Sequence, residues 1–294
     1  MFSVIMPLYN KEEYIASTIQ SVLKQSYGEF EVIVVNDGST DDSLKKVLSF
    51  KDSRIHVFTI PNGGVASARN FGIKQARYDY LAFLDADDSW DPDYLLTMKK
   101  LIDYYPSAGL FISAYDAYLN GIKIYSNKIE GLSKYSLLHD YFESSYKFGL
   151  PINITSATCL KREIANSIPM FRNGIKRGED IDVWLRVSLG YPVAFCNVPL
   201  MRYEIASSNS LSAHYTNKNE EFPYFEWLSY KSNSKYYSKY VMLMIYIFAK
   251  NSYDAHDYKT CFQTLWKTHF IAPRVKLFKR LYLWFASFVK LTLK

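Results

Sequence analysis

The strongest constraint on the fold is an alternation of strand and helix patterns through residues 1–105. Short apolar runs suited to strands occur at residues 3–6, 31–35, 55–60 and 80–84, and segments with helical periodicity lie between them. The second run is apolar on both faces, as strands buried within parallel sheets are. This βαβα alternation predicts a Rossmann-like α/β fold, in which a mostly parallel sheet carries helices on both faces.

Length and charge predict one main domain with a C-terminal appendage. The chain has 294 residues and a net charge of +6, but residues 222–294 hold 12 Lys and Arg against three acidic residues. That stretch shows only helical patterns, so we expect a basic helical module that serves an anionic surface. No nucleic-acid-binding motif accompanies the charge, and we expect no nucleic-acid partner.

Cysteine usage and hydropathy predict a cytoplasmic protein. Cys159, Cys196 and Cys261 are widely spaced, which suggests neither a zinc site nor a disulfide framework. The N-terminus lacks the pattern of a signal peptide. The longest uncharged apolar run, residues 241–249, is much shorter than the ~20 residues of a spanning helix.

Polar residues follow the predicted strands at the points where the strands end. Asn10 comes after the first strand, which Pro7 is expected to end, Asp37 after the second, and Asp85 and Asp87 after the fourth. Because ligands of open parallel sheets bind beyond the carboxyl ends of the strands, these side chains are expected to share one site. Asn10 and Glu13 also have the spacing of a helix N-cap and its partner.

The sequence Asp85-Ala86-Asp87 has the chemistry of a divalent metal site. Two carboxylates two residues apart in an extended segment can face one ligand. Mg²⁺ and Mn²⁺ typically take one or two carboxylates together with diphosphate oxygens. The alternative is a solvated acidic turn that caps the next helix.

A series of motifs along residues 2–190 resembles family 2 glycosyltransferases, which have the GT-A fold and invert the anomeric centre. The blocks that carry the resemblance are residues 6–11, 35–41, 62–64 with 68–72, 83–88, and 178–180 with 184–186. The resemblance implies a nucleotide-sugar-binding half over residues 1–105 and an acceptor-binding half over residues 106–215. A C-terminal helical region, residues 216–294, follows them and lies outside the resemblance.

The resemblance also implies how the donor is held. Pro7 and Tyr9 would flank the nucleotide base, and Asp37 would accept a hydrogen bond from the base or ribose. Arg69 would lie near the diphosphate, where a guanidinium pairs well with phosphate oxygens. The remaining donor-site residues that it implies are Asn10, Asp85 and Ala86, with Asp87 as the ligand of Mn²⁺ or Mg²⁺.

For the chemical step, the resemblance implies that Asp180 is the general base and that Glu179 beside it positions a substrate. An acidic pair that opens a helix can instead simply match the helix dipole. His214 is a candidate second metal ligand or a surface histidine. At residues 169–173 the chain departs from the family's Gly-Phe-Asp-like turn, so the acceptor loop cannot be transferred.

These observations predict an inverting glycosyltransferase that moves one sugar, most often from a UDP-sugar, to a glycan or lipid-linked acceptor in bacterial surface polysaccharide synthesis. The Gln-x-x-Arg-Trp block of processive members is absent from the sequence, which favours single-sugar addition. Two alternatives remain open: transfer to polyprenyl phosphate, which needs no strong base, and a nucleotide-sugar-binding protein without turnover.

The last helical pattern, residues 274–294, is amphipathic and basic. One face carries mainly apolar residues, namely Leu277, Phe278, Leu281, Trp284, Phe285, Phe288 and Leu291. The other face carries Lys276, Arg280, Ser287, Lys290 and Lys294, together with Leu283. Such a helix suits peripheral contact with an anionic membrane on its cytoplasmic side. It is also compatible with packing on the catalytic domain or in a homodimer.

Overall fold

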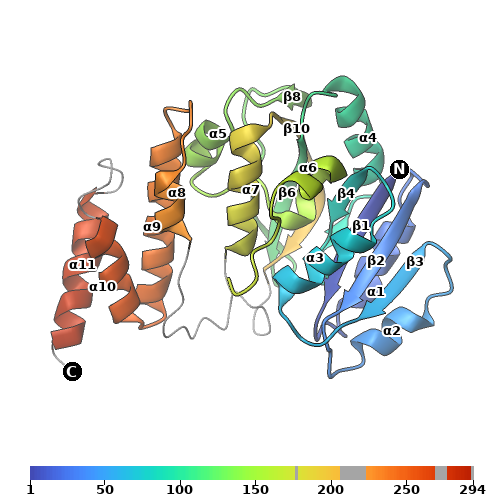
Figure 1. Ribbon diagram of the computed structural model, residues 1–294, viewed down its shortest axis with the longest axis horizontal. Helices are drawn as coiled ribbons and strands as arrows, with labels where there is room; N and C mark the ends of the chain where they lie inside the picture. Colours follow the sequence, from blue (N-terminus) through green and yellow to red (C-terminus); the bar gives the residue numbers. More distant parts are fainter. Residues whose placement is uncertain (176–177, 206–222, 269–276, 293–294) are drawn as a thin grey trace. The chain divides into compact units, whose positions relative to one another are not determined.

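The computed structural model describes residues 1–175, 178–205, 223–268 and 277–292 (Figure 1). The chain forms two compact units. The first unit comprises Met1–His139 and Asn153–Ile205, and the second comprises Asp140–Ile152 and Ala206–Lys294. The division into residues 1–105, 106–215 and 216–294 that the sequence suggests stays a prediction.

The first unit is built on a sheet that has ten strands among the described residues, in the order β3-β2-β1-β4-β9-β6-β10-β5, with β7 beside β6 and β8 beside β10. The strands are β1 (Phe2–Leu8), β2 (Phe30–Asn36), β3 (Ile55–Thr59), β4 (Tyr80–Phe83), β5 (Ser89–Trp90), β6 (Leu110–Leu119), β7 (Ile122–Ser126), β8 (Tyr135–Leu137), β9 (Thr158–Lys161) and β10 (Val193–Glu204).

The parallel part of this sheet is the part that the sequence predicted. β1 pairs in parallel with β2 and β4, and β2 pairs in parallel with β3. β9 runs antiparallel between β4 and β6, while β6 and β10 pair in parallel. The α/β class and the mostly parallel, GT-A-like sheet are therefore confirmed, although the sequence pattern did not reveal β9.

Helices cover both faces of the sheet. The first unit contains α1 (Ile15–Leu23), α2 (Ser43–Ser49), α3 (Val65–Gln75), α4 (Tyr94–Tyr104), the 3₁₀ turn η1 (Thr155–Ala157), α6 (Arg162–Ser167) and α7 (Glu179–Gly190). Apolar residues of α1, α2 and α4 join one core with the side chains of Val4, Met6 and Val34. α3 packs on the opposite face, where a Cβ at Gly72 would lie 2.7 Å from Ile5 Cγ2, so only glycine allows this approach.

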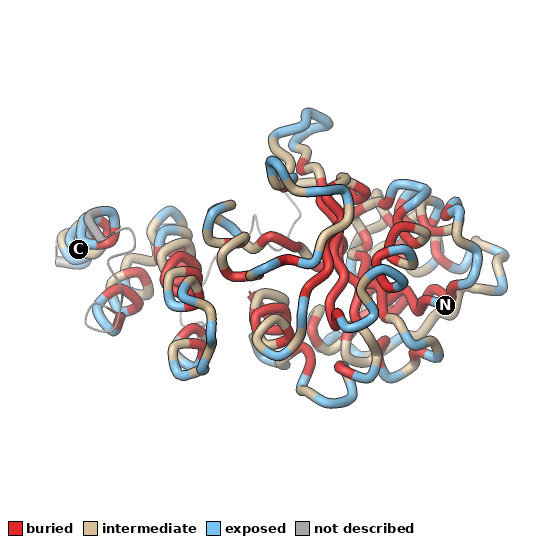
Figure 2. The backbone as a smooth tube through the Cα atoms, turned by 90° about the horizontal axis from the view of Figure 1, so that it is seen from above, coloured by how far each residue is buried: buried red, intermediate tan, exposed pale blue. Residues whose placement is uncertain are grey.

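Buried residues concentrate in the strands of this unit (Figure 2). β1 and β2 are buried along their whole length. The free thiols of Cys159 and Cys196 are part of the same core, as expected for structural cysteines. A sheet covered on both faces has free polar access only at the ends of its strands, and this places the functional side chains there.

The prediction that Pro7 ends the first strand is wrong, because β1 continues to Leu8 and Pro7 pairs with Val35 of β2. Leu8 O accepts a bond from Asp37 N and Ile5 O from Leu84 N, so alternate residues of β1 face β2 and β4. Pro7 falls on the β4 side, where the pairing has already ended at Ile5. Its missing N–H therefore removes no ladder bond.

The second unit consists of helices. α5 (Tyr141–Phe148) packs on α9 (Tyr237–Asp254), where the Phe142 and Tyr237 ring centroids are 4.9 Å apart. α8 (Tyr224–Ser229), α10 (Tyr258–Thr268) and α11 (Leu277–Thr292) complete its described part. Among the described residues, no helix has the length and apolar character needed to span a bilayer.

Candidate active site

Three loops meet at the carboxyl edge of the parallel strands. They follow β1, β2 and β4, and backbone and side-chain bonds join the first two. Asn10 accepts a bond from Thr40 N at 2.8 Å, its own N–H donates to Ser39 Oγ, and Lys11 N donates to Ser43 Oγ. The edge is thus a connected polar surface, as the strand order predicts.

Asn10 does not cap a helix, and that prediction is wrong. α1 begins at Ile15, and the residue that precedes it is Tyr14. Asn10 instead has a positive φ of 49°, a left-handed conformation that asparagine tolerates better than most residues. This conformation turns the chain so that the Asn10 amide reaches the loop after β2.

The residues predicted to hold the nucleotide differ widely in exposure. Pro7 lies buried within β1, whereas Tyr9 directly after the strand is 45% exposed and free to pack on a planar ring. Asp37 is buried, and its two carboxylate oxygens accept bonds from Gly63 N and Gly64 N, both at 2.8 Å. Asp37 therefore fixes the turn that precedes α3, and each of its oxygens keeps a second lone pair for a ligand.

The acidic sequence 85–88, in the loop after β4, is held in place by residues from several other elements. Thr18 Oγ1 donates to the carbonyl of the buried Ala86 at 3.0 Å, and Lys11 Nζ pairs with Asp87 Oδ2 at 2.5 Å. Asp88 is buried, where it accepts bonds from Ser156 Oγ and Glu204 N. Burial, and then the charges of Asp87 and Asp85, raise the pKa of Asp88 well above its usual range.

Arg69 is at the centre of the site. Its guanidinium is 4% exposed and donates to Asp85 and to Glu179, with 2.8 Å between the closest atoms in each case. Burial alone would lower the pKa of Arg69, but the charges of Asp85, Glu179 and Asp180 raise it above its ordinary value. Arg69 thus links α3, the loop after β4 and the start of α7.

Glu179 and Asp180, which open α7, have different surroundings. Glu179 is buried against Arg69, and burial together with the charge of Asp180 raises its pKa to about 7, although Arg69 opposes the shift. Asp180 is only half-buried. Its Oδ1 accepts a bond from Ile181 N, and its Oδ2 accepts one from Thr155 Oγ1 at 3.2 Å. Of the two carboxylates, Asp180 is therefore the one that a substrate can reach.

The carboxylates of the site fit a divalent cation only if the protein supplies a single ligand. Within the described ranges, no cluster of three or more His, Cys, Asp or Glu side chains could hold a metal ion by itself. Asp85 is engaged by Arg69, whereas Asp87 is 18% exposed and, among the described residues, keeps its Oδ1 without a partner. The protein would thus supply one carboxylate and the diphosphate most other oxygens, as is usual for Mg²⁺. His214 lies outside the described residues.

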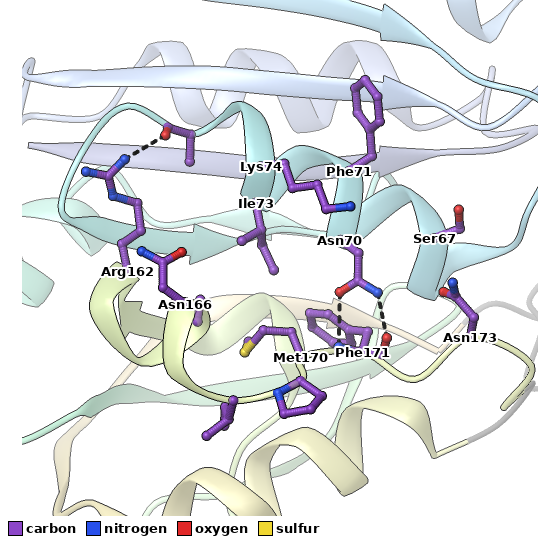
Figure 3. A pocket seen from close by; sticks show the side chains of 14 residues that line it. Ser67, Asn70, Phe71, Ile73, Lys74, Arg162, Asn166, Met170, Phe171 and Asn173 are labelled. Carbon is purple, nitrogen blue, oxygen red and sulfur yellow. Dashed lines mark hydrogen bonds between the residues drawn. The ribbon is translucent and has the colours of Figure 1, made fainter.

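The loop at residues 169–173, where the sequence departs from the family pattern, is firmly anchored. Asn70 on α3 donates to Phe171 O and accepts from Phe171 N, as Figure 3 shows. Arg186 on α7 donates to the carbonyls of Pro169 and Met170. The loop borders a cavity of about 580 Å³ between α3 and α6. Phe171 lines this cavity, and the centroid of its ring lies 5.1 Å from the Arg69 guanidinium.

Several residues of the site carried no signal that sequence reasoning used. Lys11 lies in the motif at residues 6–11, but the family resemblance implies no role for it. Three further residues reach the site because β9 and β10 bring them to the edge of the sheet, namely Thr155, Ser156 and Glu204. No local sequence pattern predicts these two strands. Thr155 and Ser156 could have been predicted only from knowledge that an antiparallel strand lies beside β4 in the sheet.

The fold defines an α/β protein with a polar site at the carboxyl ends of its parallel strands, and comparison with known proteins specifies the family. The model of the family described as "Glycosyl transferase family 2" matches residues 3–168. The chain therefore belongs to glycosyl transferase family 2.

Two curated relatives and one solved structure illustrate the likeness. The chain is 31% identical to an uncharacterized glycosyltransferase of Rickettsia bellii over 83% of this chain and 34% of that protein. A second relative is WfgD of Escherichia coli, a UDP-Glc:alpha-D-GlcNAc-diphosphoundecaprenol beta-1,3-glucosyltransferase. The chain is 47% identical to WfgD over 31% of this chain and 36% of that protein. The structure of S. aureus TarS 1-349 in complex with UDP-GlcNAc matches with a TM-score of 0.63 at 19% identity, covering 97% of this chain and 79% of that one. The chain spans about a third of the length of these curated relatives.

Proposed function

We propose that this protein is an inverting glycosyltransferase that moves a single sugar from a UDP-sugar to a glycan or lipid-linked acceptor in bacterial surface polysaccharide synthesis. Membership of the family supports the reaction class. Two relatives support the choice of substrates: WfgD has a UDP-sugar donor and a diphosphoundecaprenol-linked acceptor, and TarS forms a complex with UDP-GlcNAc. We assign donor binding to residues 1–105 and acceptor binding to residues 106–215.

One observation carries the proposal. A half-buried carboxylate, Asp180, stands beside the buried Arg69 network, and the partly exposed Asp87 follows β4 at the same edge. In this assignment Asp180 takes the proton of the acceptor hydroxyl as its oxygen attacks the anomeric carbon. Arg69 holds Asp85 and Glu179 through its two ion pairs, and Glu179 would position the acceptor or the donor sugar.

The donor is held by the remaining residues of the edge. Tyr9 packs on the base beside Pro7, and Asp37 accepts a hydrogen bond from the base or ribose. Asn10 and Ala86 shape the pocket through their loops, and Asp87 would hold Mn²⁺ or Mg²⁺. A bound divalent ion would stabilise the charge that develops on the departing diphosphate. Carboxylates engage the two terminal nitrogens of Arg69, whereas its Nε has no partner among the described residues and keeps an N–H for a ligand.

A thermal-shift screen of UDP and UDP-sugars, with and without Mn²⁺, tests the proposal, because a ligand that binds the native state raises Tm. We expect UDP to raise Tm, and to raise it further with Mn²⁺. In Asp87→Ala the Mn²⁺-dependent increment should disappear, while the protein still folds with a somewhat lower Tm, because Lys11 loses its partner. Asp103→Ala on the surface of α4 is the matched control and should keep the increment. An increment that persists in Asp87→Ala would refute the assignment of the metal ligand.

Two alternatives predict different results. If the acceptor is polyprenyl phosphate, it is already ionised, and replacement of Asp180 will leave the rate nearly unchanged. If the protein binds nucleotide-sugars without turnover, UDP-sugars will raise Tm but no acceptor will receive a sugar. The presence of both Asp87 and Asp180 argues against the second alternative, a protein that binds nucleotide-sugars without turnover.

We also propose that the second unit holds the enzyme peripherally on the cytoplasmic face of an anionic membrane. α11 turns Arg280, Leu283 and Ser287 inward, where they are buried. Its opposite face is exposed over several apolar side chains, namely Leu281 (37%), Tyr282 (69%), Phe285 (61%), Phe288 (45%) and Leu291 (39%). We call these five residues the aromatic face. Two lysines of the same helix, Lys279 and Lys290, are also exposed.

An anionic lipid surface suits this combination of apolar and basic side chains better than a second copy of the chain does. Lysines near an anionic surface gain about 1 kcal/mol each, and aromatic residues favour the headgroup region. In a homodimer related by a two-fold axis, the lysines at the border would approach lysines of the partner. Dimerisation through the aromatic face is therefore the contrary outcome of the test described in the Discussion.

A further inference from the structure

A short 3₁₀ turn touches both acidic centres of the site. η1 (Thr155–Ala157) directly precedes β9, which runs antiparallel to β4. The start of an antiparallel strand lies beside the end of its neighbour. The topology therefore places Thr155 and Ser156 next to the loop that begins at Asp85.

Ser156 holds the loop after β4 through a single hydroxyl. Its Oγ accepts a bond from Asp85 N at 3.0 Å and donates to Asp88 Oδ2 at 2.6 Å. The carbonyl of Ser156 accepts the indole N–H of Trp90 at 2.6 Å, which fixes the turn itself. With 1% of its surface exposed, Ser156 is shielded from solvent competition. The two ends of the 85–88 sequence are thus tied to one residue.

The neighbouring Thr155 holds the other acidic centre. Its Oγ1 donates to Asp180 Oδ2 at 3.2 Å and accepts a bond from Trp184 Nε1 at 3.4 Å. Trp184 is buried on α7, one turn after Asp180, and Thr155 is 2% exposed. The indole N–H occupies a lone pair of the hydroxyl, so the hydroxyl hydrogen points to the carboxylate.

We propose that Thr155 and Ser156 are a pair of positioning residues that set the distance between the base, Asp180, and the loop that binds the donor. This inference rests on the proposed function. Transfer requires the attacking oxygen and the anomeric carbon to be aligned, and an error of about 1 Å can cost about 10²-fold in rate. Adjacent residues of one rigid turn are suited to keep that distance, because neither hydroxyl can move without the other.

The two members of the pair make separable predictions. Thr155→Val removes the bond to Asp180 in a nearly isosteric way and should lower kcat at least tenfold, with KM for the UDP-sugar within about twofold of the wild type. Thr155→Ser restores the hydroxyl and should recover most of kcat. Ser156→Ala loosens the 85–88 loop and should raise KM for the donor at least threefold.

Thr158→Val is the matched control. Thr158 is fully buried two residues after Ser156, and its hydroxyl bonds to Ile154 O and to the Asn153 amide instead of to a carboxylate. Its replacement should lower Tm about as much as Thr155→Val does, while kcat and KM stay near those of the wild type. If Thr155→Val does not fold, Thr155→Ala removes the same hydroxyl and is judged by the same criterion.

Steady-state kinetics and Tm of these variants decide the matter. The proposal is overturned if kcat of Thr155→Val stays within twofold of the wild type, if Thr155→Ser fails to recover it, or if Thr158→Val loses activity equally. A separate result distinguishes failure of the function: wild-type protein that transfers no sugar from any UDP-sugar overturns the glycosyltransferase assignment itself. In a double-mutant cycle, Thr155→Val should have little further effect on kcat in the Asp180→Asn background.

Discussion

The sheet edge of the first unit and helix α11 of the second unit differ in which side chains they bury and which they expose. In the first unit, charged groups lie at the sheet edge and are paired with each other, as Arg69 is with Asp85 and Glu179. In the second unit, α11 buries Arg280 and Ser287 and exposes Phe285 and Tyr282. The paired charges fix the geometry of the site within the first unit. The exposed apolar side chains of α11 form a surface that can bind a membrane or another protein.

This contrast predicts where a mutation acts. Removing a charge from the edge of the first unit should affect stability or turnover, because buried ion pairs leave an uncompensated partner when one member is lost. Removing an aromatic side chain from the exposed face of α11 should affect neither, because little of its surface is buried within the chain. The predictions below test this difference, from the largest expected effect to the smallest.

The largest effect is expected at Arg69. Arg69→Met keeps the length of the side chain but leaves Asp85 and Glu179 without their shared cation, which should cost about 3–5 kcal/mol of unfolding free energy. Urea denaturation measures the change. Lys99→Met, which removes an exposed ion pair to Asp103 on α4, is the control and should cost less than about 1 kcal/mol. Equal losses in the two variants would contradict a central role of Arg69.

At Asp180 the effect should appear in turnover. Asp180→Asn preserves the shape of the side chain and its bond from Thr155, but removes the basic oxygen, so kcat should fall by about 10²-fold or more. Affinity for UDP, measured by calorimetry, should hardly change, because the donor is bound by other residues. Asp103→Asn on the surface of α4 is the control. A near-normal rate in Asp180→Asn would instead favour transfer to polyprenyl phosphate.

A smaller effect is expected from the titration of Glu179. Its pKa is raised from an ordinary 4.5 to about 7, so between these values the folded state keeps a proton that the unfolded state has lost. The contribution of protonated Glu179 to the unfolding free energy is fully present below pH ~4.5 and is lost as pH rises through about 7. Relative to Glu179→Gln, the wild type should therefore lose about 1–3 kcal/mol over this interval. Unfolding curves measured across the interval check the sign, and a difference independent of pH would contradict it.

The same contrast explains which features the sequence could predict. In the first unit, the apolar runs identified β1 to β4, of which β1 and β2 are buried along their whole length and β3 is only partly buried. The positions of the residues after these strands, such as Asp37 and Asp87, follow from parallel topology. β9 and the contacts of Thr155 and Ser156 could not be predicted, since β9 (Thr158–Lys161) is polar at both ends and lacks the continuous apolar run that identified the equally short β4.

In the second unit, the periodicity of α11 could not decide which side of the helix the protein covers. An amphipathic helix usually buries its apolar side. Here the buried side includes Arg280, whose guanidinium donates to Thr268 O at 3.2 Å, and Ser287. Apolar contacts with α10 come from Leu283 and from Trp284, which stacks on Phe262. The orientation depends on this particular tertiary contact, and no pattern within α11 contains it.

The smallest effect on the folded protein, with a large effect on its location, is expected at the aromatic face. Phe285→Ser and Tyr282→Ser should weaken binding to vesicles of phosphatidylcholine and phosphatidylglycerol about tenfold each, since burial of a large apolar side chain contributes about 1.5–3 kcal/mol. Tm and UDP affinity should stay unchanged, because 61% of Phe285 and 69% of Tyr282 are exposed in the folded chain. Ile122→Ser, at a residue 68% exposed on β7, is the matched control and should bind vesicles normally.

The basic residues at the border of the aromatic face give the second half of this test. Lys279→Gln and Lys290→Gln should each cost about 1 kcal/mol of binding to the anionic vesicles and nothing with pure phosphatidylcholine. Added salt should weaken wild-type binding in the same way, because the lysines are exposed and therefore screened. Two outcomes would refute the membrane assignment: wild-type protein that ignores anionic vesicles at low salt, or a dimer in solution that Phe285→Ser converts to monomer. The second outcome would identify the aromatic face as an interface between copies of the chain, and the contrast between the two units would then be one of assembly instead of membrane attachment.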